Sequence, residues 1–281
     1  MPTDDELIAA RAAELAGRSD GGFEVSRFLT PHGQAVFFRA VAAVSTDKLN
    51  KLFFYGGCRG AERRAAVFFP DWAIVDDMPP CFPDTPLFSP EREAFFHEEI
   101  LSYGGEEVHG ITSVTVRGSG YRTLGHRDYL GSLLALGIDR SSVGDIVTDG
   151  EYSARIFLFS KIASLAVSEL DRVGSDRVTV VRETPPFGFV SARRTEEVAV
   201  VAASMRLDAL LGAVFPMSRS DAKELVERGL SEVNYLTEDR PERTLAAGDV
   251  VSARGYGKFE VKGTDGATRS GRVRAVVRKY V

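Results

Sequence analysis

The stretch MRLDALLGAVFPMSRSDAKELVERGLSEVNYLTEDRPERTLAAGDVVSARGYGKFEVK, residues 205–262, carries the strongest fold signal in this 281-residue chain. Its first part places apolar side chains at helical spacing, at Leu207, Leu210, Leu211 and Val214. A proline follows two residues later, where a helix is expected to end. The pattern predicts a short amphipathic helix that packs one face on a core.

A second helix is predicted directly after the first. Ser218 is a suitable N-cap, Asp221 stands three residues on as in a capping box, and Gly229 is suited to end the helix. Arg219 and Lys223 are four residues apart, so they share one face near the positive end of the helix dipole. This arrangement favours a phosphate backbone as partner, although the same pair could form only a solvated helix face.

Strand signals fill the second half of the stretch. Residues 233–234 open a strand, a Gly-Asp turn lies at 248–249, and VVSARGYGKFEV (250–261) predicts a strand, a glycine-rich bend and another strand. The bend places Arg254 and Lys258 beside bare glycine backbone, which a phosphate can approach closely. Taken alone, this run could be only a hairpin turn.

Charge is distributed unevenly along the chain. The net charge is −5, with 44% hydrophobic and 27% charged residues, as in an ordinary globular protein. Residues 206–281 hold 14 Lys and Arg against 11 Asp and Glu, a net charge of +3, whereas residues 1–205 hold 21 against 29, a net charge of −8. A phosphate-binding surface is therefore expected in the C-terminal part of the chain.

Composition excludes several classes of protein. No apolar run is long enough for a transmembrane helix, and the acidic start is unlike a signal peptide, so we expect a cytoplasmic protein with no membrane partner. Cys58 and Cys81 stand far apart without flanking histidines, which predicts two free thiols and no metal site. No catalytic constellation stands out, so we expect no cofactor and no enzymatic activity.

Residues 1–84 are predicted to form a small N-terminal α/β domain. Helices are expected over 4–17 and 33–44, and strands over 51–57 and 65–70, on either side of a glycine-bearing turn.

Residues 85–183 are predicted to form a central domain with the order β-α-β-β-α-β, after a helix at 91–103. The expected elements are a strand at 111–118, a helix at 126–138, strands at 144–150 and 152–159, a helix from Ser160, and a strand at 177–183. This order is ferredoxin-like, as in RNA-recognition motifs, and gives an α+β fold class. Residues 184–204 are expected to be a linker that can add an edge strand to the last domain, 205–281.

The sheet of the central domain is a weak candidate for binding single-stranded RNA. Stacking of bases requires exposed aromatic side chains on the two central strands, in a K/R-G-F/Y-G/A-F-V-x-F/Y run. The strand YSARIFLF (152–159) lacks that run, and VTVRG (114–118) has no aromatic residue. Phe157 and Phe159 are therefore expected to lie in the core.

The tripeptide His126-Arg127-Asp128 matches the start of the protein-kinase catalytic loop, but the other kinase motifs are absent from the sequence. Two interpretations stay open. Asp128 can favour the positive end of a helix dipole as a structural cap, or His126 and Arg127, with Arg140, can form a secondary contact with RNA or the ribosome.

The order of the C-terminal signals resembles the S-four domain, a small RNA-binding module named after a small-subunit ribosomal protein. The matching positions are Arg206-Leu207-Asp208, Ser218-Arg219-Ser220 with Ala222, Gly229, Val233-Asn234, Gly248-Asp249 and Arg254-Gly255-Tyr256-Gly257-Lys258-Phe259. The run GLSEVN departs from the family, which usually has a shorter run with a second valine, so the exact start of the strand stays open. The RNA-binding residues expected on this basis are Arg206, Ser218, Arg219, Ser220, Lys223, Arg228, Asn234, Arg254, Gly255, Tyr256 and Lys258.

Two further blocks, GGCRGAERR (56–64) and LGHRDYLGSLLALGIDRSSVGDI (124–146), resemble the bacterial YlmH family, in which an RRM-like domain precedes a C-terminal S-four domain. Cys58 stands where that family commonly has an aromatic residue. The resemblance implies a non-catalytic factor in the quality control of stalled nascent chains. It would bind ribosomal RNA, with tRNA as a second candidate partner, on the large ribosomal subunit. No specificity for a DNA sequence is expected.

Two other classes of function stay open. The acidic N-terminal domain could serve as a scaffold or interaction module, including one linked to cell division. An RNA-modifying enzyme is the less favoured alternative, because pseudouridine synthases need an R-L-D-x-x-T-S-G run and the R-L-D here continues as ALLGAV. A methyltransferase would need a glycine-rich loop inside a βαβ unit, which GGCRG does not open.

Overall fold

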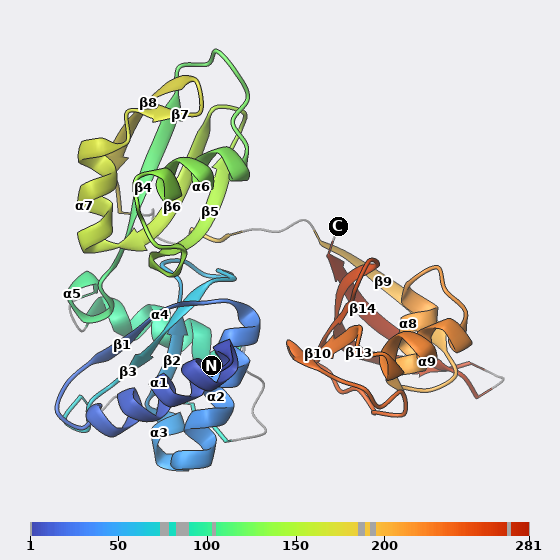
Figure 1. The fold of residues 1–281 in the computed structure, drawn as a ribbon. Coiled ribbons are helices and arrows are strands. Elements are labelled where there is room, and N and C mark those ends of the chain that lie inside the picture. The colour runs from blue at the N-terminus through green and yellow to red at the C-terminus, as the bar shows by residue number, and fades with distance from the viewer. Residues whose placement is uncertain are drawn as a thin grey trace. The chain divides into compact units, whose positions relative to one another are not determined.

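The computed structural model describes residues 2–73, 79–82, 90–102, 105–184, 189–191, 195–268 and 271–280 (Figure 1). Contacts divide the chain into two compact units, residues 1–191 and 192–281. Helices and sheets of mainly antiparallel strands occur in both units, which confirms the predicted α+β fold class. In the part of the chain that the structure describes, no helix has both the length and the apolar character needed to span a bilayer.

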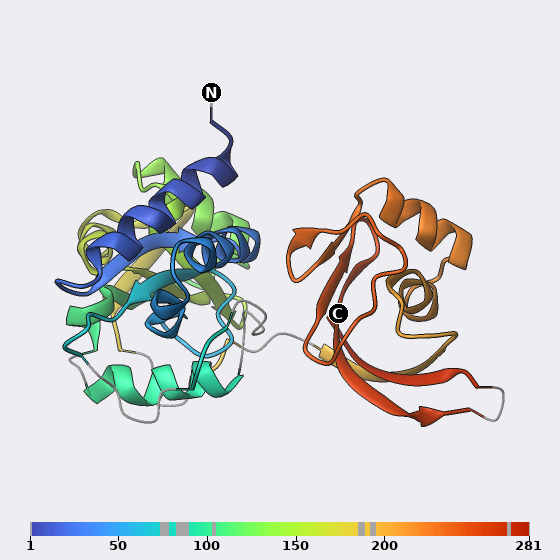
Figure 2. The same cartoon turned by 90° about the horizontal axis from the view of Figure 1, so that it is seen from below.

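An antiparallel sheet in the order β1-β3-β2 organises the first part of unit 1. The elements are α1 (Asp4–Arg18), β1 (Glu24–Leu29), α2 (Pro31–Val44), α3 (Thr46–Asn50), β2 (Leu52–Tyr55), β3 (Arg64–Phe68) and α4 (Pro90–Ser102). Successive strand residues point to opposite faces, so Leu52 and Phe68 pack with α1 and α2, whereas Phe53 packs with Phe96 of α4. Figure 2 shows these helices on opposite sides of the sheet. Helix α4 thus packs with the first sheet, which differs from the domain boundary expected at residue 84.

The second part of unit 1 contains a five-stranded sheet in the order β5-β6-β4-β8-β7. Its elements are α5 (Glu106–His109), β4 (Ile111–Gly118), α6 (His126–Ala135), the 3-10 helix η1 (Arg140–Ser142), β5 (Val143–Asp149), β6 (Ser153–Phe159), α7 (Ser160–Glu169), β7 (Arg172–Val173) and β8 (Asp176–Arg182). The order β4-α6-β5-β6-α7-β8 is the predicted β-α-β-β-α-β arrangement, with the short strand β7 added. Helices α6 and α7 cover one face of the sheet (Figure 1).

The other face of this sheet is covered by the turn between β2 and β3. Phe157 of β6 is completely buried and packs with Cys58 and Ala61 of that turn. Phe159 is half-buried, with its ring 4.8 Å from the ring of Phe28. The expectation that both phenylalanines are core residues is therefore met, and the centre of this face cannot stack bases.

Polar contacts attach the same turn to β5. The carboxylate of Asp145 accepts hydrogen bonds from the backbone N–H groups of Glu62, at 2.7 Å, and Arg63, at 2.9 Å. The Arg63 guanidinium donates to the carbonyl oxygens of Val143 and Arg140, at 3.0 and 3.2 Å. Most of the block GGCRGAERR is thus explained by its role in joining the two sheets of unit 1.

Unit 2 is built on a six-stranded antiparallel sheet in the order β11-β10-β12-β13-β14-β9. Its elements are β9 (Thr195–Ala202), α8 (Leu207–Val214), α9 (Arg219–Glu227), β10 (Ser231–Val233), β11 (Leu236–Thr237), β12 (Val250–Ala253), β13 (Gly257–Ala267) and β14 (Val273–Tyr280). Leu210, Leu211 and Val226 of the helices pack with Phe259 and Val277 of the sheet. β9 is one of the two edge strands and lies inside the segment expected to be a linker. The arginine pair of that segment, Arg193 and Arg194, lies outside the described residues.

A buried histidine predicts that unit 1 loses stability in acid. His109 is 5% exposed, and its Nδ1 accepts a hydrogen bond from the backbone N–H of Ile111 at 3.0 Å. Burial lowers the pKa of His109 to about 4; the charge of Glu106 opposes this shift and His97 adds to it. The unfolded chain therefore binds a proton below about pH 6.5 that the folded chain excludes. His109 should contribute a loss of about 2 kcal/mol in the free energy of unfolding between pH 7 and pH 5. His97, whose pKa burial also lowers to about 4, should add a further loss over the same range.

Urea unfolding at several pH values, followed by the fluorescence of Trp72, measures this effect, because Trp72 is the single tryptophan of the chain and lies in unit 1. The variant His109→Gln keeps a hydrogen-bond acceptor and should lose about half of the pH dependence, because His97 retains its share. His126→Gln, which changes an exposed histidine, should keep it. Equal pH dependence in His109→Gln and the unmodified chain would contradict the assignment.

Candidate nucleic-acid interface

Local sequence explains how α8 and α9 begin. Arg206 is the N-cap of α8 and Ser218 is the N-cap of α9. The Ser218 hydroxyl accepts a hydrogen bond from the backbone N–H of Asp221 at 3.1 Å, and the Asp221 carboxylate accepts one from the backbone N–H of Ser218 at 3.2 Å. The predicted capping box is therefore present. The hydroxyl groups of Ser218 and Ser220 lie 2.8 Å apart, so Ser218 has a structural role in addition to any contact with a ligand.

A buried carboxylate fixes two arginines at the surface, and we call this group the Asp208 clamp. Arg206 donates to the two carboxylate oxygens of Asp208 from Nε at 3.0 Å and Nη2 at 3.2 Å, and Arg219 donates from Nε at 3.3 Å. The Asp208 side chain is 4% exposed, whereas those of Arg206 and Arg219 are 38% and 54% exposed. The fixed guanidinium groups keep further N–H donors that can reach a phosphate.

The electrostatics of the Asp208 clamp favour the ionised state. Burial alone would raise the pKa of Asp208, but hydrogen bonds and positive charge from Arg206 and Arg219 outweigh burial and lower this pKa below its ordinary value. The carboxylate is thus charged at neutral pH, and with its two arginines the clamp has a net charge of +1.

Two other predicted cations of α9 have acidic neighbours on the same helix. Lys223 lies 3.5 Å from a carboxylate oxygen of Glu227, and Arg228 lies 3.4 Å from one of Glu224. All four side chains are more than half exposed, so these pairs are weak and can open for a ligand. Three cations and three acids alternate along α9 and its C-cap, so this helix has no net charge.

The glycine-rich bend lies at the C-terminal end of α8. Gly255 and Gly257 have φ angles of 86° and 127°, which favour glycine. The ring of Tyr256 is 45% exposed and lies 6.1 Å from the ring of Phe215, which ends α8. Arg254 is exposed and has no ion-pair partner among the described residues. This bend therefore presents a glycine backbone, a tyrosine ring and a free guanidinium together.

Lys258 lies on a different face from the Asp208 clamp. Its neighbour Phe259 points into the core beneath the helices, so Lys258 points to the opposite face of the sheet. There its Nζ lies 4.4 Å from the ring centroid of Tyr280 and 5.5 Å from that of Tyr235. The structure therefore does not bring all the predicted cations of unit 2 into one site.

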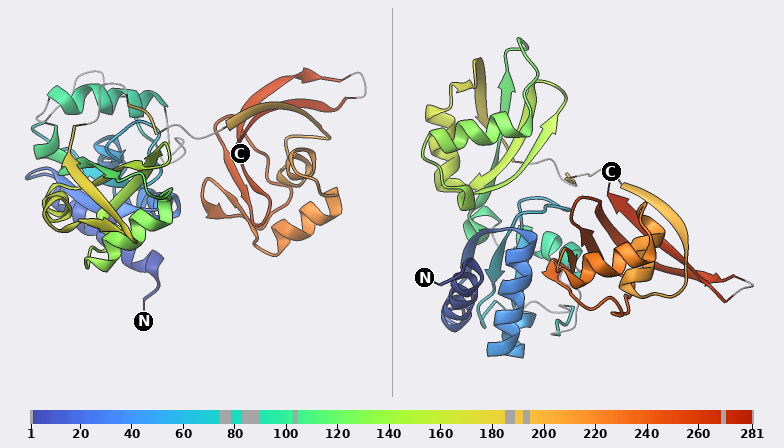
Figure 3. Two further views of the ribbon diagram at one scale, coloured as in Figure 1. Left: turned by 90° about the horizontal axis from the view of Figure 1, so that it is seen from above. Right: turned by 45° about the vertical axis from the view of Figure 1, so that its right-hand side comes forward.

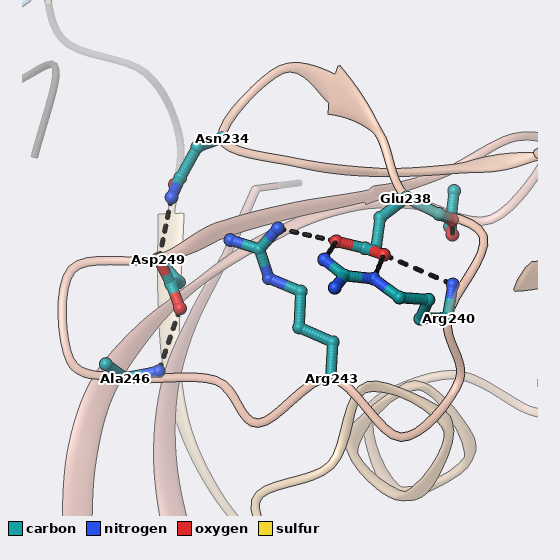
Figure 4. Close-up of polar contacts among 7 residues, drawn as sticks. Asn234, Glu238, Arg240, Arg243, Ala246 and Asp249 are labelled. Atoms are coloured by element: carbon teal, nitrogen blue, oxygen red, sulfur yellow. Dashed lines mark hydrogen bonds and ion pairs between the residues drawn. The ribbon is translucent and has the colours of Figure 1, made fainter. Parts of the chain in front are cut away.

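Asn234 has a structural role in the turn after β10 (Figure 4). It adopts φ 53° instead of opening a strand, as the sequence had indicated. Its Nδ2 donates to the Asp249 carboxylate at 2.7 Å, and its Oδ1 accepts from the backbone N–H of Val250 at 3.0 Å. Asp249 also accepts from the backbone N–H of Ala246 at 2.8 Å. Both polar atoms of the Asn234 amide are used in these contacts. Asn234 therefore positions the turn, and its side chain is less available for an RNA contact than the sequence had indicated.

A second buried carboxylate, Glu238, was not identified from the sequence. Arg240 donates to it from Nε at 2.8 Å and Nη2 at 3.1 Å, and Arg243 donates from Nη1 at 2.6 Å (Figure 4). The hydrogen bonds from Arg240 are the main cause of a pKa of about 2 for Glu238. The carbonyl oxygen of Arg243 in the same loop accepts a hydrogen bond from the backbone N–H of Leu207. This loop therefore lies beside the Asp208 clamp. The alternation of acidic residues and arginines in EDRPER (238–243) is the sequence pattern that could have indicated this ion-pair cluster.

The predicted secondary contact in unit 1 does not form one site. His126 and Arg127 are exposed in the first turn of α6. Asp128 accepts hydrogen bonds from the backbone N–H of Gly125 at 2.9 Å and from Arg122, so the capping interpretation of Asp128 is confirmed. Arg140 lies elsewhere, in η1, and donates to the carbonyl oxygen of Val143 at 2.7 Å.

Several known proteins are similar to this chain in sequence or in fold. Residues 117–185, from the end of β4 through β8, match the family model described as "Putative RNA-binding domain in YlmH". The chain is 26% identical over 246 residues to the ribosome-associated protein quality control protein P2 of Bacillus subtilis (strain 168), covering 88% of this chain and 83% of that protein. Among solved structures, the cell division protein YlmH from Streptococcus pneumoniae aligns with a TM-score of 0.44 and 16% identity, over 68% of this chain and 96% of that one.

The fold and these contacts define a class of protein. It is an α+β protein whose central domain matches a model described as RNA-binding and whose C-terminal unit fixes arginines at its surface with buried carboxylates. The resemblance to the bacterial YlmH family that was inferred from the sequence is confirmed by the family model and by the Bacillus subtilis relative.

Proposed function

We propose that this chain is an RNA-binding protein that attaches to structured ribosomal RNA through its C-terminal unit, as an S-four module. We further propose that it acts in the cytoplasm on the large ribosomal subunit, with tRNA as a neighbouring ligand, during quality control of stalled nascent chains. The observation that carries the proposal is the Asp208 clamp, which orders Arg206 and Arg219 at the surface. The family match and the name of the Bacillus subtilis relative support the same role.

The proposed activity is binding and not catalysis. Arginine groups held by carboxylates are suited to phosphate recognition, because a planar guanidinium offers several donors without a proton transfer. The histidines His97 and His109 have pKa values lowered to about 4 by burial, so both are neutral at pH 7.

The double variant Arg219→Ala with Lys223→Ala tests the helix surface. Each phosphate contact adds about 0.7–0.9 to the slope of log affinity against log salt, so the slope should fall by about 1.5 and the Kd should rise about tenfold in 0.1 M salt. Fluorescence anisotropy with a transcript of large-subunit ribosomal RNA, across a salt series, measures both quantities. Arg206 keeps its two hydrogen bonds to Asp208 in this variant, so the fold should persist with some loss of stability, and circular dichroism checks it.

The matched control is Arg11→Ala with Arg18→Ala, which removes two exposed cations from α1 of unit 1. Like Lys223, each of them lies beside a glutamate on its own helix, so the change in charge and in helix surface is comparable. The control should bind RNA as the unmodified chain does. A folded Arg219→Ala, Lys223→Ala protein with unchanged affinity would overturn the assignment of this surface.

Sedimentation with ribosomal subunits tests whether the protein associates with the large subunit. Absence of the protein from the large-subunit fraction would contradict that part of the proposal.

A further inference from the structure

The positive charge of unit 2 is concentrated in its last hairpin. Residues 206–249, which include both helices, hold 6 Lys and Arg against 9 Asp and Glu, a net charge of −3. Residues 250–281 hold 8 against 2, a net charge of +6. The two helices are therefore not the most basic part of the unit. Strands β13 and β14 hold 5 Lys and Arg against 2 Asp and Glu, a net charge of +3, so they supply half of the positive charge of residues 250–281.

The two strands place these cations on one face. Phe259 and Val261 of β13, and Ala275 and Val277 of β14, are buried in the core under the helices. Side chains alternate along a strand, so the residues between them point to the opposite, outer face. Alternation places Lys258, Glu260, Arg274, Val276, Arg278 and Tyr280 on the outer face. The register shifts between Val261 and Gly263, and Lys262 is placed on the same face by its hydrogen bond to Glu260. Figures 2 and 3 show the hairpin of β13 and β14 extending beyond α8 and α9, which lie on the other side of the sheet.

A half-buried carboxylate orders the centre of this face. Glu260 is 19% exposed and accepts a hydrogen bond from Nζ of Lys262 at 3.0 Å and from Nη1 of Arg278 at 3.2 Å. Glu197 of β9 pairs in register with Arg278 and also points to this face, because its neighbour Val198 packs on the core. Lys258, Lys262, Arg274 and Arg278 against Glu260 and Glu197 still leave an excess positive charge. Among the described residues, the ion-pair partner of Arg274, further along the hairpin, is the exposed carboxylate of Asp265 at 4.0 Å, a contact that contributes little in water.

We propose that the outer face of the β13–β14 hairpin is a second phosphate-binding surface, along which the backbone of a structured RNA lies. This inference rests on the proposed RNA-binding function and extends it to the face opposite the Asp208 clamp. Arg274 and Arg278 are about 13 Å apart by strand rise, long enough to meet more than one phosphate. Contacts of this kind neutralise backbone charge and carry no sequence information, so the surface would add affinity and salt dependence without base specificity.

Two variants of opposite sign test the surface in the full-length chain. Lys262→Ala with Arg274→Ala removes two cations of the outer face, and we expect a Kd about tenfold higher in 0.1 M salt and a salt slope lower by about 1.5. Glu260→Gln removes the neutralising charge while it keeps the side-chain shape, and we expect tighter binding by about threefold or more. Anisotropy with the ribosomal RNA transcript measures both, and the α1 control variant should behave as the unmodified chain.

The outcomes separate this inference from the function on which it rests. If Arg219→Ala, Lys223→Ala weakens binding but both hairpin variants bind as the unmodified chain does, RNA binding stands and the hairpin surface is overturned. If the unmodified chain does not bind the transcript at all, both fail together. Opposite shifts in the two hairpin variants, with native circular dichroism in each, support the hairpin surface, because a loss of fold cannot tighten binding in Glu260→Gln.

Discussion

Replacing Asp208 with alanine is expected to lower the free energy of unfolding of unit 2 by about 3 kcal/mol and to remove much of its affinity for RNA. The side chain is 4% exposed and accepts three hydrogen bonds from Arg206 and Arg219. Removing one partner of a buried ion pair typically costs about 3–5 kcal/mol, and the lower end applies here because both arginines are partly exposed and can regain water. Affinity falls as well, although one negative charge is removed, because α8 and α9 lose the buried contact that holds them together and the two guanidinium groups lose their fixed orientation. Glu260 does not join two helices, so its replacement by glutamine keeps the strands and removes only charge.

Hydrogen–deuterium exchange of α8 and α9 measures this loss locally, without a contribution from unit 1. Asp265→Ala is the matched control. The Asp265 side chain is 74% exposed and lies as far as 4.0 Å from Arg274, so this ion pair is weak and its loss should not change exchange in the helices. Asp208→Asn separates charge from shape, because it keeps the volume and loses the carboxylate charge. Unchanged protection of α8 in Asp208→Ala would show that the carboxylate does not stabilise the helix pair.

Local patterns were sufficient to predict both helices of unit 2, but not the Asp208 clamp. The capping box of Ser218 and Asp221 spans four residues, so the sequence contains all of it. The contact between Asp208 and Arg219 joins residues eleven positions apart in different helices. It depends on how closely the helices approach at Gly212, where an added Cβ would lie 3.6 Å from the Cα of Arg219. No spacing rule for a single helix contains that information.

Strand geometry explains two differences between the expectations and the structure. Arg254 and Lys258 flank the same glycine-rich bend, and the sequence therefore predicted that they form one site. Strand alternation after Gly257 instead directs Lys258 to the outer face of the sheet. β1 was not predicted, because the register of its pairing with β3 shifts between Val25 and Phe28 and interrupts the alternation of side chains. Both effects depend on the partner strand, which a pattern within one segment does not show.

The second large effect is expected from Gly57→Ala, which should lower the free energy of unfolding of unit 1 by about 4 kcal/mol. Gly57 has a φ angle of 93°, where an L residue is strained by about 1–2 kcal/mol. An added Cβ would lie 2.9 Å from Cε1 of Phe157 and closer still to Cδ1. Phe157 is completely buried between the β2–β3 turn and the five-stranded sheet, so its ring cannot move aside without disturbing the contact between the two sheets.

Urea unfolding followed by Trp72 fluorescence measures this effect, with Gly150→Ala as the matched control. Gly150 also has a positive φ angle, 68°, but nothing lies within 4 Å of an added Cβ, so this control should cost about 1 kcal/mol. The steric part can be isolated with Phe157→Leu: in that background, Gly57→Ala should cost less than in the unmodified chain, with a coupling energy of about 1–3 kcal/mol. If Gly57→Ala costs no more than Gly150→Ala, the close packing of the turn on the sheet is refuted. In that case the sheet face that contains Phe157 would again be a candidate for base stacking, because it is the packing of the β2–β3 turn on Phe157 that covers this face.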